Sequence, residues 1–303
     1  MADRLFKQRV PSILLHRTAG ILFLLLILQI PSAAQGRNTP NPGGAADGKR
    51  AENADYTPED VYYLGRAVAA NIVSHYRPYK QNRKLSDYLN NICTSLIINS
   101  PIRAPAMYSG YHVLVLDSNA INAFSSPAGH IFITRGLVGC APSEDALAAV
   151  IAHEIAHIQL EHSITLLADK DISLMLELDE VARRSRQRAA RLRPVSERIS
   201  SLRESVQAMT DALFTNGYTQ KQEFEADIHA LSLLRAAGYQ PSALVDLLRV
   251  FQQRQERSRS VFYSTHPAPS LRINNIQSRI GQSSANNAAV RKNRFEAAIR
   301  PGD

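Results

Sequence analysis

The chain has 303 residues, of which 45% are hydrophobic and 20% are charged. This composition excludes an intrinsically disordered protein and is typical of a globular one with a substantial core. The formal net charge is +8, and it is +5 without the first 34 residues, where four basic side chains stand against one acid. So small a surplus does not indicate a nucleic-acid partner, and we expect none.

The N-terminus has the composition of an export signal. A basic stretch ends at Arg17, an apolar run follows over Ala19–Ile30, and the small residues Ser32 and Ala34 suit a signal peptidase. The run is shorter than the roughly 20 apolar residues that a membrane span needs. We therefore expect a cleaved signal peptide over 1–34 and an exported protein, periplasmic or secreted. An uncleaved membrane anchor is the alternative.

The sequence predicts a linker and two helices after the signal. Residues 35–56 are rich in Gly, Pro, Asn and Ala, a composition typical of a flexible linker. The folded domain is expected to begin at Thr57, a residue type that caps helices, followed by Pro58 and two acids in the first turn. The first helix is predicted to run towards Tyr76, and the second covers about residues 85–98.

Two short apolar segments of strand length follow, His112–Leu116 and Ile131–Thr134. The segment Ser125–Gly129 between them has turn composition, so we interpret the pair as a small antiparallel unit. The two cysteines, Cys93 and Cys140, lie on either side of this unit in the sequence. Export would permit a disulfide between them, but two separate buried thiols are the favoured interpretation.

The next helix is predicted to begin after Ser143, a good N-cap, because Glu144 and Asp145 complement the helix dipole in its first turn. Apolar residues recur along it at helical spacing, and it carries the sequence HEIAH at residues 153–157. Residues 165–215 then form a strongly charged segment that is interpreted as a helical insert.

Further helices are predicted around Glu223–Leu234, over Pro241–Gln255 and from Ser270 onwards. Residues 281–303 are interpreted as a polar, disordered tail. The sequence therefore predicts one α+β domain over 57–280 that is mainly α-helical, with a small β unit and a charged insert.

The HEIAH sequence places His153 and His157 one helical turn apart, so both imidazoles project from one face and can bind a single Zn²⁺. Glu154 lies beside them and can act as the general base that activates the attacking water in peptide hydrolysis. The motif has only moderate specificity by itself. An amphipathic helix with a surface histidine pair is the alternative.

A catalytic zinc needs a third protein ligand. His162 lies nine residues after His153, which is about the opposite side of a continuous helix, so a structural or surface role is favoured for it. Glu223 and Asp227 are four residues apart on one face of a predicted helix. One of these carboxylates can bind the metal and the other can orient a ligand histidine, whereas Glu225 is expected to point away.

In this combination the chain resembles the gluzincin zinc metallopeptidase family that contains the CAAX prenyl endopeptidase and HtpX, and its soluble periplasmic members in particular. The resemblance extends over about 58–280. It rests on five segments in the family's order: EDVYYLGRAVAANI at 59–72, NAFSSPAGHIFITRGL at 122–137, HEIAH at 153–157, EFEAD at 223–227 and THPAPSLRI at 265–273. The chain departs from the family at Ala128, where a glycine often follows the proline.

The resemblance implies a role for each matched residue. Glu223 falls on the family's third metal ligand, in agreement with the spacing, and Asp227 falls on the carboxylate behind a ligand histidine. His266 and Arg272 fall on residues near the family's active site, where they could stabilise the oxyanion of the tetrahedral intermediate or gate the metal. An ordinary loop residue is the alternative for His266. Residues 122–134 fall on the family's substrate-binding edge, which would hold an extended peptide by main-chain hydrogen bonds.

The sequence thus predicts a zinc-dependent endopeptidase with one Zn²⁺ per chain that acts on misfolded or envelope polypeptides. A periplasmic chaperone or assembly factor with little proteolysis is the alternative, and a structural zinc with four protein ligands is a weaker one. Within the insert, six arginines and no acid lie in Arg183–Arg193. A solvated helix face is the favoured interpretation of this run, and contact with an anionic membrane surface is the alternative.

Overall fold

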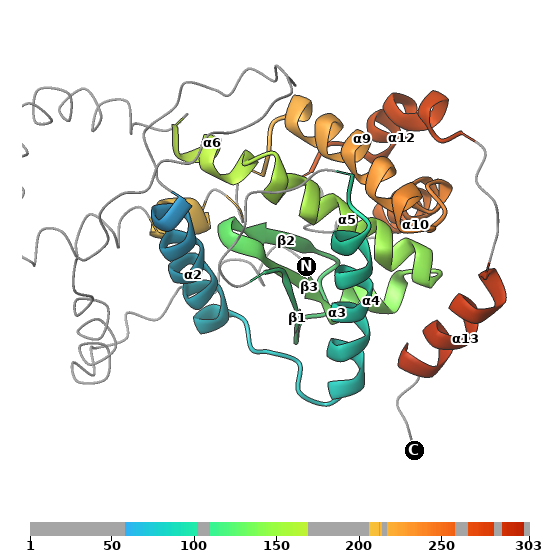
Figure 1. Ribbon diagram of the computed structural model, residues 1–303, viewed down its shortest axis with the longest axis horizontal. Helices are drawn as coiled ribbons and strands as arrows, with labels where there is room; N and C mark the ends of the chain where they lie inside the picture. Colours follow the sequence, from blue (N-terminus) through green and yellow to red (C-terminus); the bar gives the residue numbers. More distant parts are fainter. Residues whose placement is uncertain are drawn as a thin grey trace, which may run out of the picture. The chain divides into compact units, whose positions relative to one another are not determined.

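The computed structural model describes residues 58–101, 110–168, 206–211, 213, 217–257, 266–281 and 287–299. All of them belong to one compact unit, Glu52–Asp303. The predicted signal peptide, the linker and most of the insert, including Arg183–Arg193, lie outside the described residues. Helices dominate the described part, and they surround one small sheet (Figure 1). The predicted mainly helical α+β class is therefore correct in outline.

Two helices open the domain, as the sequence predicts: α2 (Pro58–His75) and α3 (Arg83–Ile98). α3 begins after Asn82, whose side-chain oxygen accepts a hydrogen bond from the Leu85 amide at 3.0 Å. One face of α3 is buried at helical spacing, which explains why an apolar periodicity marks it in the sequence. The buried residues are Leu85, Leu89, Ile92, Cys93 and Leu96.

The sheet has three strands in the order β1-β3-β2: β1 (His112–Leu116), β2 (Ala123–Ser126) and β3 (His130–Thr134). The predicted antiparallel pairing of the two apolar segments is wrong, because β1 and β3 run parallel with His112 opposite His130. The hairpin partner of β3 is β2, which pairs with it antiparallel. The sequence predicts a turn at Ser125 and Ser126, but both lie in β2, because burial within the domain outweighs the weak strand preference of serine.

The turn between β2 and β3 covers Pro127–Gly129. Ala128 has a φ of 67° in this turn, a left-handed conformation that costs a residue with a Cβ about 1–2 kcal/mol. The family's more usual glycine would avoid that cost. A Cβ on Gly65 of α2 would lie 2.0 Å from the Pro127 carbonyl oxygen, so α2 approaches the turn backbone to a distance that only glycine permits.

Helix α5 (Glu144–Gln159) is the centre of the domain, and it begins as predicted: the Ser143 hydroxyl accepts a hydrogen bond from the Ala146 amide at 3.2 Å. The sequence indicates one core face, but all residues from Ala146 to Ile158 are buried. Five alanines along the helix allow α3, α9 (Gln220–Ala236), α10 (Ser242–Arg257) and β2 to pack closely around it.

The tail predicted as disordered contains a helix, α13 (Ala288–Ile299). This helix contacts α3 and α5. Arg291 Nε donates a hydrogen bond to Asp145 Oδ2 at 2.9 Å, and Arg294 pairs with Glu144, so α13 binds the acidic first turn of α5. Basic residues are interspersed with the apolar ones in α13, and ion pairs supply part of its contacts with the domain.

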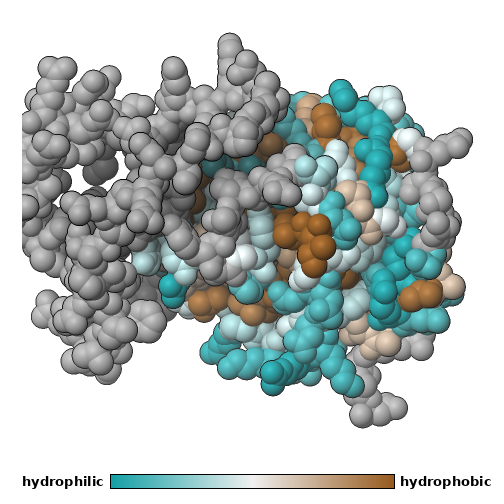
Figure 2. All heavy atoms as spheres, viewed as in Figure 1, coloured by the Kyte–Doolittle hydropathy of each residue, from teal (hydrophilic) through white to brown (hydrophobic). Residues whose placement is uncertain are grey.

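The shorter elements of the domain are α4 (Arg135–Cys140), α6 (His162–Ala168), α12 (Pro269–Ile276) and the single turn η4 (Gln277–Arg279). Cys93 and Cys140 are free and buried, which confirms the favoured interpretation. On the described part of the face in Figure 2, apolar residues form separate small patches among hydrophilic ones. Among the described helices, none is both long and apolar enough to cross a membrane.

Candidate metal centre

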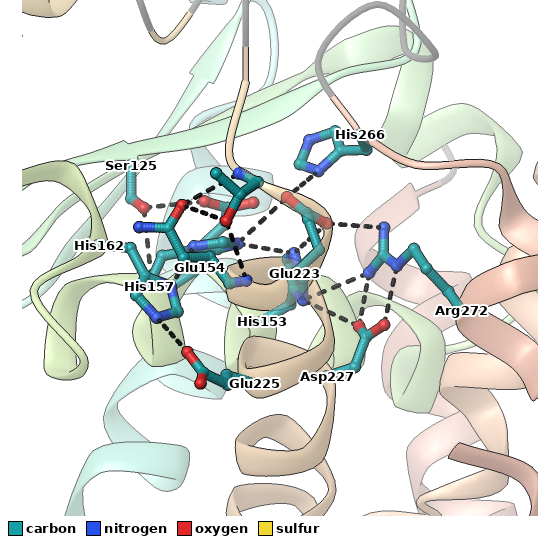
Figure 3. A network of polar contacts seen from close by, with 12 residues as sticks. Ser125, His153, Glu154, His157, His162, Glu223, Glu225, Asp227, His266 and Arg272 are labelled. Atoms are coloured by element: carbon teal, nitrogen blue, oxygen red, sulfur yellow. Dashed lines mark hydrogen bonds and ion pairs between the residues drawn. The ribbon is translucent and has the colours of Figure 1, made fainter. Parts of the chain in front are cut away.

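Helices α5 and α9 pack against each other and supply most of the predicted site residues (Figure 3). His153, Glu154 and His157 lie on α5, and Glu223 and Asp227 lie on α9. All five are at most 4% exposed. α9 begins with a capping box in which the Thr219 and Gln222 side chains bind each other's backbone amides, which fixes the helix start beside the first carboxylate.

His153, His157 and Glu223 meet at one point. The two Nε2 atoms lie 3.0 Å apart. Glu223 Oε2 lies 3.5 Å from His153 Nε2, and Glu223 Oε1 lies 3.5 Å from His157 Nε2. Ligand atoms bound tetrahedrally to one zinc at 2.0–2.1 Å are about 3.3 Å apart. The three side chains are therefore spaced as ligands of one Zn²⁺ would be.

Two further observations fit a cation at this point. Glu223 Oε2 is buried and has no hydrogen-bond partner among the described residues, although Arg272 Nη1 lies 3.5 Å away. Burial by itself would raise the pKa of Glu223, but His266, His153 and Arg272 outweigh it and hold that pKa well below its usual range. The buried carboxylate is therefore ionised, and a bound metal would supply the missing partner of Oε2.

The second carboxylate, Asp227, lies behind the candidate ligand His153. Asp227 Oδ1 is 3.0 Å from His153 Nδ1, on the side of the ring away from Nε2. Arg272 donates two hydrogen bonds to Asp227, from Nη2 to Oδ1 at 2.6 Å and from Nε to Oδ2 at 2.9 Å. This carboxylate can fix the orientation and tautomer of His153, and the arginine balances its charge.

Glu154 lies beside the histidines and is bound by Ser125 of β2, a residue to which the sequence assigns no separate role. The Ser125 hydroxyl donates to Glu154 Oε2 at 2.9 Å. Burial raises the pKa of Glu154, and His153, His266 and Ser125 partly offset that rise. A carboxylate with a raised pKa in a buried site suits a general base that must also return its proton.

His266 and Arg272 both reach the site from the segment 266–273, and they are 8% and 3% exposed. His266 Nδ1 lies 2.8 Å from Glu223 Oε1. One nitrogen of His266 also forms a second possible ligand group with His153 and Glu223, whose ligand atoms lie within 4.8 Å of one another. The group that includes His157 has the shorter separations, so we favour it as the ligand set and place His266 beside it.

Of the two roles favoured for His162, structural or surface, the surface one is wrong, because this residue is buried against the site. α5 ends at Gln159, Glu161 has a φ of 55°, and α6 begins at His162. The prediction assumes one continuous helix from His153 to His162, and this break shows that assumption to be wrong. Because the chain changes direction at the break, His162 Nδ1 lies 2.9 Å from His157 Nδ1. Glu225 is about half-exposed, and its Oε2 lies 3.4 Å from His162 Nε2.

Tyr218 is a further site residue that sequence reasoning missed. Its ring stacks on His157 with centroids 3.9 Å apart and an interplanar angle of 15°. Its hydroxyl is buried. A tyrosine just before a helix N-cap carries no signal that would distinguish it from an ordinary core residue.

Known peptidases have sequences similar to this one. The model of peptidase family M48 matches residues 83–280. The beta-barrel assembly-enhancing protease of Escherichia coli (strain K12) is 25% identical over 205 residues, which cover 65% of this chain and 39% of that protein. The metalloprotease LoiP of the same organism is 28% identical over 161 residues, which cover 53% of this chain and 59% of LoiP.

A mitochondrial relative is also similar. The metalloendopeptidase OMA1 of Schizosaccharomyces pombe is 29% identical over 192 residues, which cover 61% of this chain and 52% of OMA1. The matches thus span between about two-fifths and three-fifths of the relatives' own length. The family match covers more than half of this chain and includes the HEIAH and EFEAD segments. The predicted resemblance is confirmed: the chain belongs to peptidase family M48.

Proposed function

We propose that this protein is a zinc-dependent endopeptidase with one catalytic Zn²⁺ per chain. The observation that carries the proposal is the convergence of His153 Nε2, His157 Nε2 and the Glu223 carboxylate, at separations of 3.0–3.5 Å, directly beside Glu154. Membership of a peptidase family and the names of the relatives, two of them metalloendopeptidases or metalloproteases, support the same activity.

In this proposal each residue has a distinct role. When bound, zinc polarises the scissile carbonyl and lowers the pKa of a water molecule to about 7. Glu154 takes the proton of the attacking water and passes it to the leaving amine, while Ser125 holds the carboxylate through Oε2. Asp227 and Arg272 keep His153 oriented. His266, which lies 2.8 Å from Glu223, would donate a hydrogen bond to the developing oxyanion.

We propose polypeptides of the cell envelope as the substrates, reached by an exported protein. The supporting observations are the export-type N-terminal sequence and the name of the beta-barrel assembly-enhancing protease. An extended peptide would pair with the edge of β2, one of the two outer strands of the sheet, which carries Ser125 and hence lies next to Glu154. Because main-chain hydrogen bonds are available only in unfolded segments and do not depend on residue type, we expect cleavage of unfolded segments with little sequence preference.

Zinc removal tests the proposal. The purified protein is expected to contain one zinc per chain and to cleave casein, because casein offers unfolded segments. A chelator should abolish cleavage and lower the midpoint of thermal unfolding, since a ligand at 1,000 times its Kd stabilises the folded state by about 4 kcal/mol. Zinc, but not Mg²⁺, should restore both. Cleavage at the full rate by zinc-free protein would contradict the proposal.

A second candidate function is a gated protease that acts mainly as an assembly factor. The 2.8 Å contact between His266 and the proposed ligand Glu223 favours it, because the same imidazole could occupy the open metal position. We expect His266→Ala to retain zinc and to lower casein cleavage by about 10²–10³-fold, the usual loss for one oxyanion donor. A gain in cleavage would instead identify His266 as a gate. Pairing the assay with zinc content separates either result from metal loss.

A further inference from the structure

The two proposed histidine ligands have different surroundings. His153 Nδ1 faces the carboxylate of Asp227 at 3.0 Å, the usual partner for a metal-binding imidazole. His157 Nδ1 faces another imidazole, that of His162, at 2.9 Å. Both members of this second pair are buried, with 1% and 4% exposure. A short, buried contact between two imidazole nitrogens fixes where the protons can be.

Only one N–H can lie between the two Nδ1 atoms. An imidazole that binds a metal through Nε2 must carry its remaining proton on Nδ1, so His157 has to be the donor of this hydrogen bond. His162 then accepts through Nδ1 and carries its own proton on Nε2. The reverse arrangement would place a proton on His157 Nε2 and prevent metal binding there.

The surroundings of His162 favour the productive arrangement. Glu225 Oε2 lies 3.4 Å from His162 Nε2, where a carboxylate attracts an N–H and disfavours a bare nitrogen (Figure 3). On the other side, Tyr218 stacks on the His157 ring at 3.9 Å and limits its rotation. The His157 ring is thus held by His162 at its Nδ1 and by Tyr218 against its face.

We propose that His162 is a positioning residue for the zinc ligand His157, and that Glu225 supports it by selecting the tautomer in which His162 Nδ1 is an acceptor. This inference rests on the proposed zinc site. It makes His162 and Glu225 determinants of metal affinity although neither is placed to touch the metal. It also gives the half-exposed Glu225 a function that the sequence does not suggest.

The test is zinc affinity measured by competition with a chromophoric chelator. His162→Ala should weaken zinc binding by about 10–100-fold, the usual effect of removing such a partner. His162→Asn should retain affinity closer to that of the parent, because its side-chain oxygen can stand where Nδ1 accepts. Glu225→Gln should cause a smaller loss. His229→Ala is the matched control, since this half-buried histidine binds Gln159 at 2.6 Å and contacts none of the proposed ligands.

The thermal unfolding of each variant distinguishes positioning from a general effect on folding. A positioning role predicts similar midpoints for the zinc-free parent and His162→Asn. The rise on zinc addition should be reduced most in His162→Ala, which lacks the acceptor, and less in Glu225→Gln. Parental zinc affinity in His162→Ala would overturn this inference alone. Equal losses in His162→Ala and His229→Ala would do the same. If the parent binds no zinc, the proposed function fails together with this inference.

Discussion

Glu154→Gln is expected to lower casein cleavage by about 10²–10⁴-fold while zinc remains bound. The range is the usual contribution of a positioned general base, and the amide cannot accept the proton of the attacking water. Zinc should remain, because Glu154 is not among the three proposed ligands and the amide oxygen of the glutamine can accept the hydrogen bond that Ser125 donates to Glu154 in the parent. The measurement is the cleavage rate together with zinc content, for parent and variant prepared in the same way.

The matched control is Glu296→Gln, the same change at a glutamate of α13 that contacts none of the proposed site residues in the described part of the chain. It should cleave casein at the parental rate. Equal cleavage by Glu154→Gln and the parent would remove Glu154 from the mechanism. A cellular phenotype that survives Glu154→Gln would support the assembly-factor alternative, since that role does not require hydrolysis.

Arg272→Ala is expected to destabilise the folded protein by about 3–5 kcal/mol, the usual cost of removing one partner from a buried ion pair. Asp227 is fully buried, and Arg272 donates a hydrogen bond to each of its two carboxylate oxygens. Without the arginine, the Asp227 carboxylate would remain charged and unbalanced or would take up a proton. In either case His153 would lose its orienting partner, and zinc affinity should fall as well.

Arg249→Ala serves as the control for Arg272→Ala. Arg249 pairs with Asp246 at 3.4 Å on an exposed helix surface, with both side chains more than half exposed. Such pairs contribute about 0–1 kcal/mol, so chemical denaturation should show little change in the free energy of unfolding. A comparable small change for Arg272→Ala would show that the buried pair is not required for stability. Arg272→Lys should lie in between, because it keeps the charge but cannot bind both carboxylate oxygens.

Local features of the sequence predict much of the fold. The N-cap at Ser143, the helical spacing of apolar residues in α3 and the four-residue spacing within HEIAH and EFEAD each depend on a few neighbouring residues. A helix places residues four apart on one face regardless of what surrounds it. For that reason the spacing alone is enough to group His153 with His157, and likewise Glu223 with Asp227.

Contacts between distant segments depend on the tertiary structure. The pairing of β1 with β3 is parallel, because the chain between them forms β2 and returns, and no local pattern records that path. Likewise, a single left-handed residue, Glu161, ends α5 early and decides that His162 lies against His157. The periodicity of apolar residues cannot reveal this helix break, since an inference from spacing assumes that the helix continues.

Residue types and helical spacing are enough to identify the proposed chemical groups: the histidine pair, the proposed base Glu154 and the paired carboxylates. Their supporting partners come from other elements and are fixed only by folding: Ser125 for Glu154, Arg272 for Asp227 and His162 for His157. The physical reason is the range of the interactions. Helical geometry acts over one turn of chain, whereas a hydrogen bond between buried side chains depends on how separate elements pack, which only the folded domain specifies.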